Sequence, residues 1–166
     1  MTAHVRWAEG ADAPVVARLL HDFNSEFDAP SPGPEVLAPR VEELLASGTT
    51  TALLAGDPAV AVALLTSRPN VWYEGPVLLL DELYVAPAHR GRGIGSAMVE
   101  RLLADATAAG VALVEINVDE SDVDAQRFYR RHGFATGDPR SDESAFYYSR
   151  ELRPPLGDQT PLSRLP

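Results

Sequence analysis

Cysteine and lysine are both absent from the 166 residues of this chain. Without cysteine there are no disulfides, no thiolate metal ligands and no cysteine nucleophile. Because all fourteen basic residues are arginine, the chain also lacks a Schiff-base lysine and the lysine of a P-loop. The four histidines, at positions 4, 21, 89 and 132, form no H-x-x-x-H pair, so we expect no metal site.

Positive charge is scarce and long apolar runs are missing. The 24 acidic residues against 14 basic ones give a formal net charge of −10, which disfavours binding to duplex nucleic acid. A cationic partner is favoured, although an acidic balance is also common in soluble proteins. No segment approaches the roughly 20 apolar residues that span a bilayer, and the N-terminus shows no secretory signal. We therefore expect a cytoplasmic protein that binds neither nucleic acid nor membrane.

Hydrophobic periodicity and turn residues predict one α/β domain over residues 1–152, of mixed α+β character. Its sheet is expected to be mixed, mostly antiparallel and of about seven strands, flanked by four helices. The strands are expected at 5–7, 50–54, 60–68, 77–85, 111–118, after Phe134 and at 145–152, and the helices at 13–27, 35–46, 94–109 and 121–132. Asp12 is expected to cap the first helix. Residues 153–166 are rich in proline and predict a tail that is either flexible or a strap packed on the domain.

A glycine-rich turn joins the strand at 77–85 to the helix at 94–109. Its sequence is Arg90-Gly91-Arg92-Gly93-Ile94-Gly95, followed by Ser96. The glycines allow a phosphate to approach the unpaired N–H groups of a helix N-terminus, and the arginines add positive charge. The alternative is a tight turn with exposed arginines. Neither a P-loop nor a G-x-G-x-x-G dinucleotide fingerprint fits these residues.

The spacing of Arg90, Gly93 and Gly95, R-x-x-G-x-G, resembles the pyrophosphate loop of the GNAT superfamily of N-acetyltransferases. Residues 122–134, DVDAQRFYRRHGF, resemble the family's second motif, N-x-x-A-x-x-F-Y-x-x-x-G-F, with aspartate in place of its asparagine. The resemblance implies the GNAT fold and acetyl-coenzyme A as co-substrate. It also implies direct transfer of the acetyl group to a primary amine of a small molecule or peptide. A non-catalytic acyl-coenzyme A sensor on the same fold is the alternative, and the retained motif tyrosine favours the enzyme.

The resemblance also implies roles for individual residues. Tyr129 would be the acid that protonates the departing thiolate, although its helical spacing also fits a core stripe. Backbone groups of Leu83 and Val85 would hold the pantetheine arm and the oxyanion. Asp122 would contact the coenzyme, or simply cap the helix that follows. Residues 90–96 would bind the diphosphate.

Glu82 is the candidate base. Strand alternation places it with Tyr84 on one face, and a carboxylate on a central strand is costly unless it is used or paired. The alternative is an ion pair with an arginine. Aromatic and acidic residues suit a cationic amine, so Phe27, Trp72, Tyr73 and Glu82 are the expected acceptor contacts. The acceptor stays open between a small amine, an aminoglycoside and a peptide or protein amine, and dimers are frequent in the family.

Overall fold

The computed structural model describes residues 4–137 and 144–157, which form one mixed sheet between two helical layers. The strands lie in the order β1-β2-β3-β4-β5, and all neighbours are antiparallel except β4 and β5, which are parallel. The strands are β1 (Val5–Trp7), β2 (Thr50–Gly56), β3 (Ala59–Arg68), β4 (Val77–Val85) and β5 (Leu113–Ile116); the α-helices are α1 (Ala13–Glu26), α2 (Pro34–Ala46), α3 (Ile94–Ala108) and α4 (Val123–Arg131). Mixed character and four helices were both predicted.

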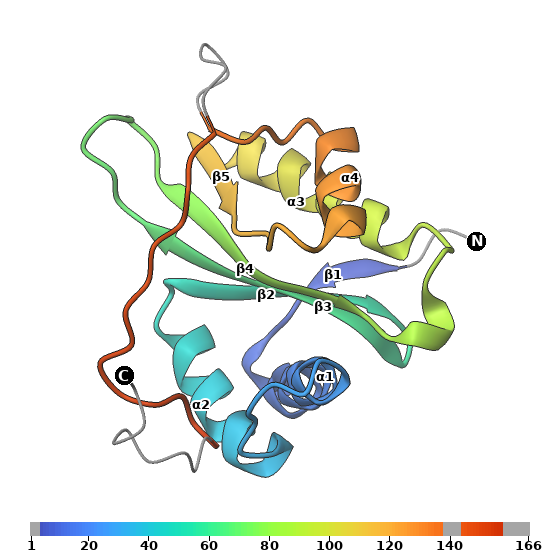
Figure 1. The fold of residues 1–166 in the computed structure, drawn as a ribbon. Coiled ribbons are helices and arrows are strands. Elements are labelled where there is room, and N and C mark those ends of the chain that lie inside the picture. The colour runs from blue at the N-terminus through green and yellow to red at the C-terminus, as the bar shows by residue number, and fades with distance from the viewer. Residues whose placement is uncertain (1–3, 138–143, 158–166) are drawn as a thin grey trace.

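The two faces of the sheet are covered by different helix pairs (Figure 1). On one face α3 and α4 bury residues such as Leu53, Leu65 and Leu80. On the other face α1 and α2 pack over residues such as Leu54 and Val62. Adjacent residues of β2 therefore enter opposite cores, which explains why this strand reads as a continuous apolar run rather than an alternating one.

A β-bulge interrupts β4 where it passes β3. Leu64 lies opposite Glu82 and Leu65 lies opposite Leu80, so Asp81 is the extra residue. Its carboxylate accepts a hydrogen bond from the Thr66 hydroxyl at 2.6 Å, on the face that α1 and α2 cover. Strict strand alternation predicts opposite faces for Asp81 and Glu82, and the bulge interrupts that alternation between Leu80 and Glu82.

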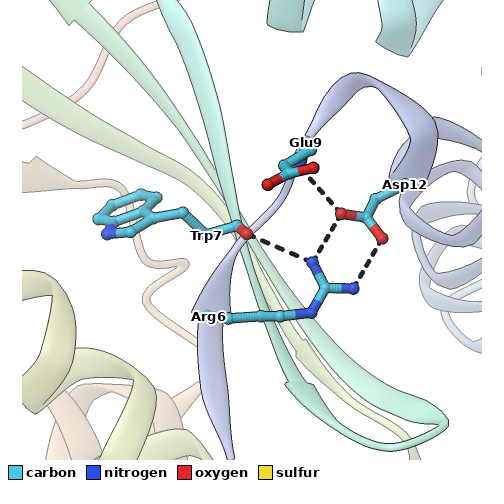
Figure 2. A network of polar contacts seen from close by, with 4 residues as sticks. All are labelled: Arg6, Trp7, Glu9 and Asp12. Atoms are coloured by element: carbon cyan, nitrogen blue, oxygen red, sulfur yellow. Dashed lines mark hydrogen bonds and ion pairs between the residues drawn. The ribbon is translucent and has the colours of Figure 1, made fainter.

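A hydrogen-bonded turn fixes the start of α1 relative to β1 (Figure 2). The Arg6 guanidinium donates to both carboxylate oxygens of Asp12, at 2.6 and 2.7 Å, and the backbone N–H of Glu9 donates to the same carboxylate at 2.8 Å. These bonds, above all the one from Arg6, lower the pKa of Asp12 to about 2. Asp12 directly precedes α1, as predicted, but its side chain makes no capping bond to the helix. It ties the helix to the sheet instead.

The final two strands of the prediction are not formed in the described residues. Neither Phe134–Gly137 nor residues 144–152 form a strand, and Phe146, Tyr147 and Tyr148 are exposed. β5 is therefore an edge strand of four partly exposed residues, shorter than the buried strand expected at 111–118. Aromatic and branched residues favour strands only where a neighbour can pair with them, and here none does.

Only part of the proline-rich tail lies within the described residues. Residues 153–157 form no helix or strand, and a Cβ at Gly157 would lie 2.5 Å from backbone atoms of Ser31 and Pro32. The tail thus contacts the loop before α2 at this point, as the strap alternative requires. Among the residues described, no helix is long and apolar enough to cross a membrane.

Candidate active site

A cavity of about 1180 Å³ opens where the C-terminal end of β4 meets the N-terminus of α3 and the beginning and outer face of α4. Its wall on one side comes from the end of α1 and the residues just after it. A cavity bounded by four separate stretches of the chain, 23–29, 82–85, 89–96 and 119–131, is a candidate small-molecule site. The lining includes Phe23, Glu26, Phe27, Glu82–Val85, Arg90, Gly91, Gly93–Ser96, Asp122, Ala125 and Phe128.

The glycine-rich turn leaves the start of α3 open to this cavity. Gly91 and Gly93 have φ values of +72° and +77°, and a Cβ at either position would meet nothing within 4 Å. No side chain caps α3, so the N–H groups of Ile94, Gly95 and Ser96 have no partner within the helix. Such a cradle suits the phosphates of a nucleotide, because it combines free donors with the positive end of the helix dipole.

Gly95 has a packing role instead. A Cβ there would lie 3.5 Å from Cζ of Phe128 and 3.8 Å from Cγ2 of Val85. These are ordinary contacts, so the position tolerates a methyl group. Gly95 lies where α3, β4 and α4 meet, and Phe128 closes this corner of the cavity.

The backbone of β4 has unused hydrogen-bonding groups facing away from β3. Ala86 N–H donates to the Val60 carbonyl, and bonded pairs alternate with non-bonded pairs along an antiparallel ladder. Leu83 and Val85 are therefore the non-bonded members, whose N–H and C=O groups point toward the β5 side. Of these groups, the Val85 C=O is occupied by the Nε–H of Arg90. There the pairing of β4 with β5 has already ended at Leu80 and Ile116. These are the groups that the family resemblance assigned to the pantetheine arm.

Arg90 is already engaged within the protein. Its Nε donates to the Val85 carbonyl at 2.8 Å, and its two terminal nitrogens donate to the two Glu26 oxygens at 2.7 Å each. The hydrogen bonds from Arg90 lower the pKa of Glu26. Arg92, by contrast, does not line the cavity, and no ion pair joins it to any residue in 4–137 or 144–157.

Glu82 lies on the cavity wall without a salt bridge to the residues described here. Burial, and secondarily the neighbouring Asp81 carboxylate, raises the pKa of Glu82 to about 6. The ion pair that was the alternative is therefore not formed. A carboxyl with this pKa is ionised at neutral pH and can still accept a proton.

Tyr129 lies in the core layer next to the cavity. It is 8 % exposed, packs edge-on against Phe128 and Phe134, and is not among the lining residues. Burial, followed by the negative charges of Asp122 and Glu82, raises the pKa of its hydroxyl. Tyr129 is therefore a neutral hydrogen-bond donor at physiological pH, and its ring belongs to the core stripe that was the alternative.

Asp122 caps α4. Its side chain accepts a hydrogen bond from the Ala125 N–H at 2.9 Å, which confirms the capping alternative. It also lines the cavity, so one carboxylate oxygen can serve the helix while the residue faces a ligand.

The residues expected to contact the acceptor do not all lie at one site in the structure. Phe27 lines the cavity, together with Phe23, which stacks on Tyr84 with ring centroids 5.4 Å apart. Trp72 and Tyr73 do not line it. They belong to the loop between β3 and β4, at the far end of the strand from the glycine-rich turn (Figure 1).

Several lining residues were not singled out from the sequence. Glu26, Phe128 and Arg131 are three of them. Phe128 could have been found, because it is one residue from Tyr129 in the same motif. Glu26 lies in the acidic and aromatic segment 21–28, but nothing local predicts its pairing with Arg90, which is 64 positions away.

With this geometry in view, comparison with known proteins establishes the family. The model of the acetyltransferase (GNAT) family matches residues 16–134, a span that contains both motifs. The chain belongs to the GNAT acetyltransferases and is an acyltransferase. An uncharacterized N-acetyltransferase of Mycobacterium tuberculosis is 31 % identical over 121 residues, which are 68 % of this chain and 76 % of that protein.

Solved structures agree with this assignment. A putative acetyltransferase from Arthrobacter sp. FB24 has a TM-score of 0.83 and 50 % identity, covering 90 % of this chain and 96 % of that one. An aminoglycoside acetyltransferase from an uncultured soil sample, solved with sisomicin, has a TM-score of 0.74 at 18 % identity, covering 91 % and 97 %. That second likeness concerns the fold alone. The predicted GNAT fold is confirmed, with five strands in the described residues rather than about seven.

The two glycines at the start of α3 should respond differently to alanine. Gly93→Ala forces an L-residue into the left-handed region and should lower the free energy of unfolding by about 1–2 kcal/mol. Gly95→Ala should be neutral, or stabilising by up to about 1 kcal/mol, because alanine is the better helix former. Urea denaturation of the two variants without ligand measures both effects. No loss in Gly93→Ala would mean that the left-handed conformation at Gly93 is not required, and a loss in Gly95→Ala would mean that this position does not tolerate a methyl group.

Proposed function

We propose that the protein transfers an acetyl group from acetyl-coenzyme A to a primary amine of a small molecule or peptide. One observation carries the proposal: the uncapped N-terminus of α3, with Gly91 and Gly93 at its mouth, opens into the same cavity as Glu82. The helix N-terminus that can bind an anion and the carboxylate that can accept a proton thus line the same cavity. Acetyl-coenzyme A, when bound, supplies the activated acetyl thioester.

Glu82 is the proposed base. An amine with a pKa near 10 arrives as a cation at neutral pH and must lose a proton before it can attack. The Glu82 carboxylate, which forms no ion pair with any described residue, attracts that cation and accepts its proton, directly or through water. The aromatic side chains of Phe23 and Phe27 line the same wall and provide an apolar surface for the rest of the acceptor.

Backbone groups and Tyr129 are proposed to handle the charges on the acyl side. The unpaired N–H groups of Leu83 and Val85 are donors for the pantetheine arm or the oxyanion. Tyr129 stays protonated, since burial raises its pKa, and its proposed role is to protonate the leaving thiolate. No cysteine exists to carry the acetyl group, so transfer is proposed to be direct.

One observation favours a second function, a non-catalytic acyl-coenzyme A sensor. Tyr129 packs in the core and does not line the cavity, so its ring could be retained for packing alone. Release of free thiol from acetyl-coenzyme A, screened across small amines, aminoglycosides and peptide amines, separates the two functions. Turnover with any acceptor excludes the sensor.

Binding of acetyl-coenzyme A should stabilise the folded protein. A ligand at 100 times its dissociation constant adds about 2.7 kcal/mol, which corresponds to a rise in Tm of roughly 5–10 °C for a protein of this size. Gly93→Asp should abolish the shift, because a carboxylate would stand beside the phosphates. Gly48→Asp is the matched control: Gly48 also has a positive φ and open space around it, but it follows α2 and should keep the shift. A shift that survives in Gly93→Asp places the coenzyme elsewhere.

Removing the Glu82 carboxylate should change the pH profile. In the wild type, kcat/KM for the amine should rise with pH through about 6 as Glu82 loses its proton. Glu82→Gln should lack this limb and keep only the rise that comes from the amine itself. An unchanged limb in the variant would assign the proton acceptor to another group.

The stability of Glu82→Gln relative to wild type should also depend on pH, in a direction that the pKa shift of Glu82 predicts. The pKa of Glu82 is raised in the folded state, so the contribution of Glu82 to the stability of the wild type falls as pH rises from about 4.5 through about 6. Glu82→Gln should therefore raise Tm relative to wild type above pH 6 and not below pH 4.5. This measurement also shows that the variant is folded.

The Tyr129→Phe variant shows whether Tyr129 acts as the catalytic acid or only packs in the core. Phenylalanine keeps the edge-on contacts with Phe128 and Phe134, so Tm and the affinity for coenzyme A should change little. Loss of a general acid should lower kcat by roughly 10²-fold. An unchanged kcat, or a large loss of coenzyme affinity, would assign Tyr129 to packing.

A further inference from the structure

Arg90 occupies the motif position whose positive charge would be expected to face the phosphates, yet its guanidinium binds the opposite wall of the cavity. Three of its donors are used within the protein: Nε on the Val85 carbonyl and both terminal nitrogens on Glu26. Resting on the proposed function, we propose that Arg90 is a positioning residue that joins the acceptor wall to the donor loop. The loop's cationic contact to the phosphates then falls to Arg92.

The ion pair between Arg90 and Glu26 fixes the orientation of both side chains and leaves Arg90 unsuited to binding an anion. Both contacts are 2.7 Å long and two-pronged, the geometry in which an arginine and a carboxylate fix each other's orientation. The carboxylate neutralises the guanidinium charge and occupies the donors that a phosphate would use. The Glu26 side chain is 26 % exposed and that of Arg90 is 43 % exposed, and both residues line the cavity.

The pair holds together three segments that are distant in sequence. Glu26 is the last residue of α1 and directly precedes Phe27, Val85 is the last residue of β4, and Arg90 begins the glycine-rich turn. The guanidinium also lies over the Tyr84 ring, 5.7 Å from its centroid. The end of α1, which carries the proposed acceptor contacts, is therefore fixed directly to the turn that holds the donor.

Arg92 has the complementary properties. It stands between Gly91 and Gly93, both in the left-handed region, and is exposed. No residue in 4–137 or 144–157 forms an ion pair with it. Arg92 does not line the cavity itself, but it belongs to the exposed turn on which a phosphate would lie. Since Glu26 neutralises Arg90, Arg92 is the arginine of this turn whose charge is left for that phosphate.

The test compares Arg90→Met, Glu26→Gln, their double variant and Arg92→Met. Calorimetry measures the Kd of coenzyme A at two salt concentrations, and steady-state kinetics at saturating acetyl-coenzyme A measure the KM and kcat of the best amine from the acceptor screen. Arg90→Met should raise the KM of the amine roughly tenfold, the cost of one charge-assisted contact, with little change in the Kd of coenzyme A. Arg92→Met should weaken coenzyme A binding and flatten its dependence on salt.

Glu26→Gln gives the sharpest contrast. It keeps the shape of the side chain but frees the Arg90 charge beside the turn, so it should raise the KM of the amine without weakening coenzyme A binding. The double variant should be no worse than Arg90→Met alone, because both changes break the same pair. A purely structural role would lower Tm in both variants without this split between amine KM and coenzyme Kd.

Two results would overturn the proposal. Arg90→Met could weaken coenzyme A binding as much as Arg92→Met does, with the same flattening of the salt dependence, and Arg90 would then be a phosphate ligand. Alternatively, the KM of the amine could stay unchanged in both Arg90→Met and Glu26→Gln, and the pair would then have no positioning role. Failure of the wild type to bind coenzyme A is a different result, and it would reject the proposed function instead.

Discussion

The parting of β4 from β5 is the constraint on which the rest of this site depends. The two parallel strands pair only from Val77 and Leu113 to Leu80 and Ile116. Beyond that point, within the described residues, β4 continues to Val85 paired with β3 alone. Apart from the Val85 carbonyl, which Arg90 binds, this edge of its backbone is left for a ligand. A backbone edge without partners is costly in an apolar interior, and a bound substrate can satisfy it where water would otherwise have to.

The bulge at Asp81 and the start of α3 complete this arrangement. By adding one residue, the bulge directs Asp81 to Thr66, while Leu83 and Val85 keep their side chains in the core beneath α3 and α4. The glycine-rich turn follows β4 after one short 3₁₀ turn, so the donors of α3 stand at the same end of the strand. Donor cradle, free backbone and Glu82 therefore lie along a single strand and its continuation.

Three carboxylates of this acidic chain, Asp12, Glu26 and Glu82, lie in contrasting environments. Asp12 and Glu26 are each bound by an arginine, which lowers their pKa values. Glu82 has no such partner in the described residues, and burial raises its pKa instead. The contrast arises from packing, because all three are ordinary carboxylates in the sequence, and it distinguishes a carboxylate that can exchange protons from two that hold the structure together.

Local and periodic features of the structure were readable from the sequence alone. The bounds of β4, the start of α3 and the two motifs around β5 were predicted, because glycine, proline and apolar spacing act on neighbouring residues. Pairings between distant residues were not: the ion pair of Arg90 with Glu26, the exclusion of Trp72 and Tyr73 from the cavity, and the absence of strands at 134–137 and 144–152. Which side chain meets which depends on strand order and on the bulge, and these arise from contacts across the whole fold. The chemical groups and their local geometry therefore follow from neighbouring residues, whereas the question of which groups face one another is answered only by contacts between distant parts of the folded chain.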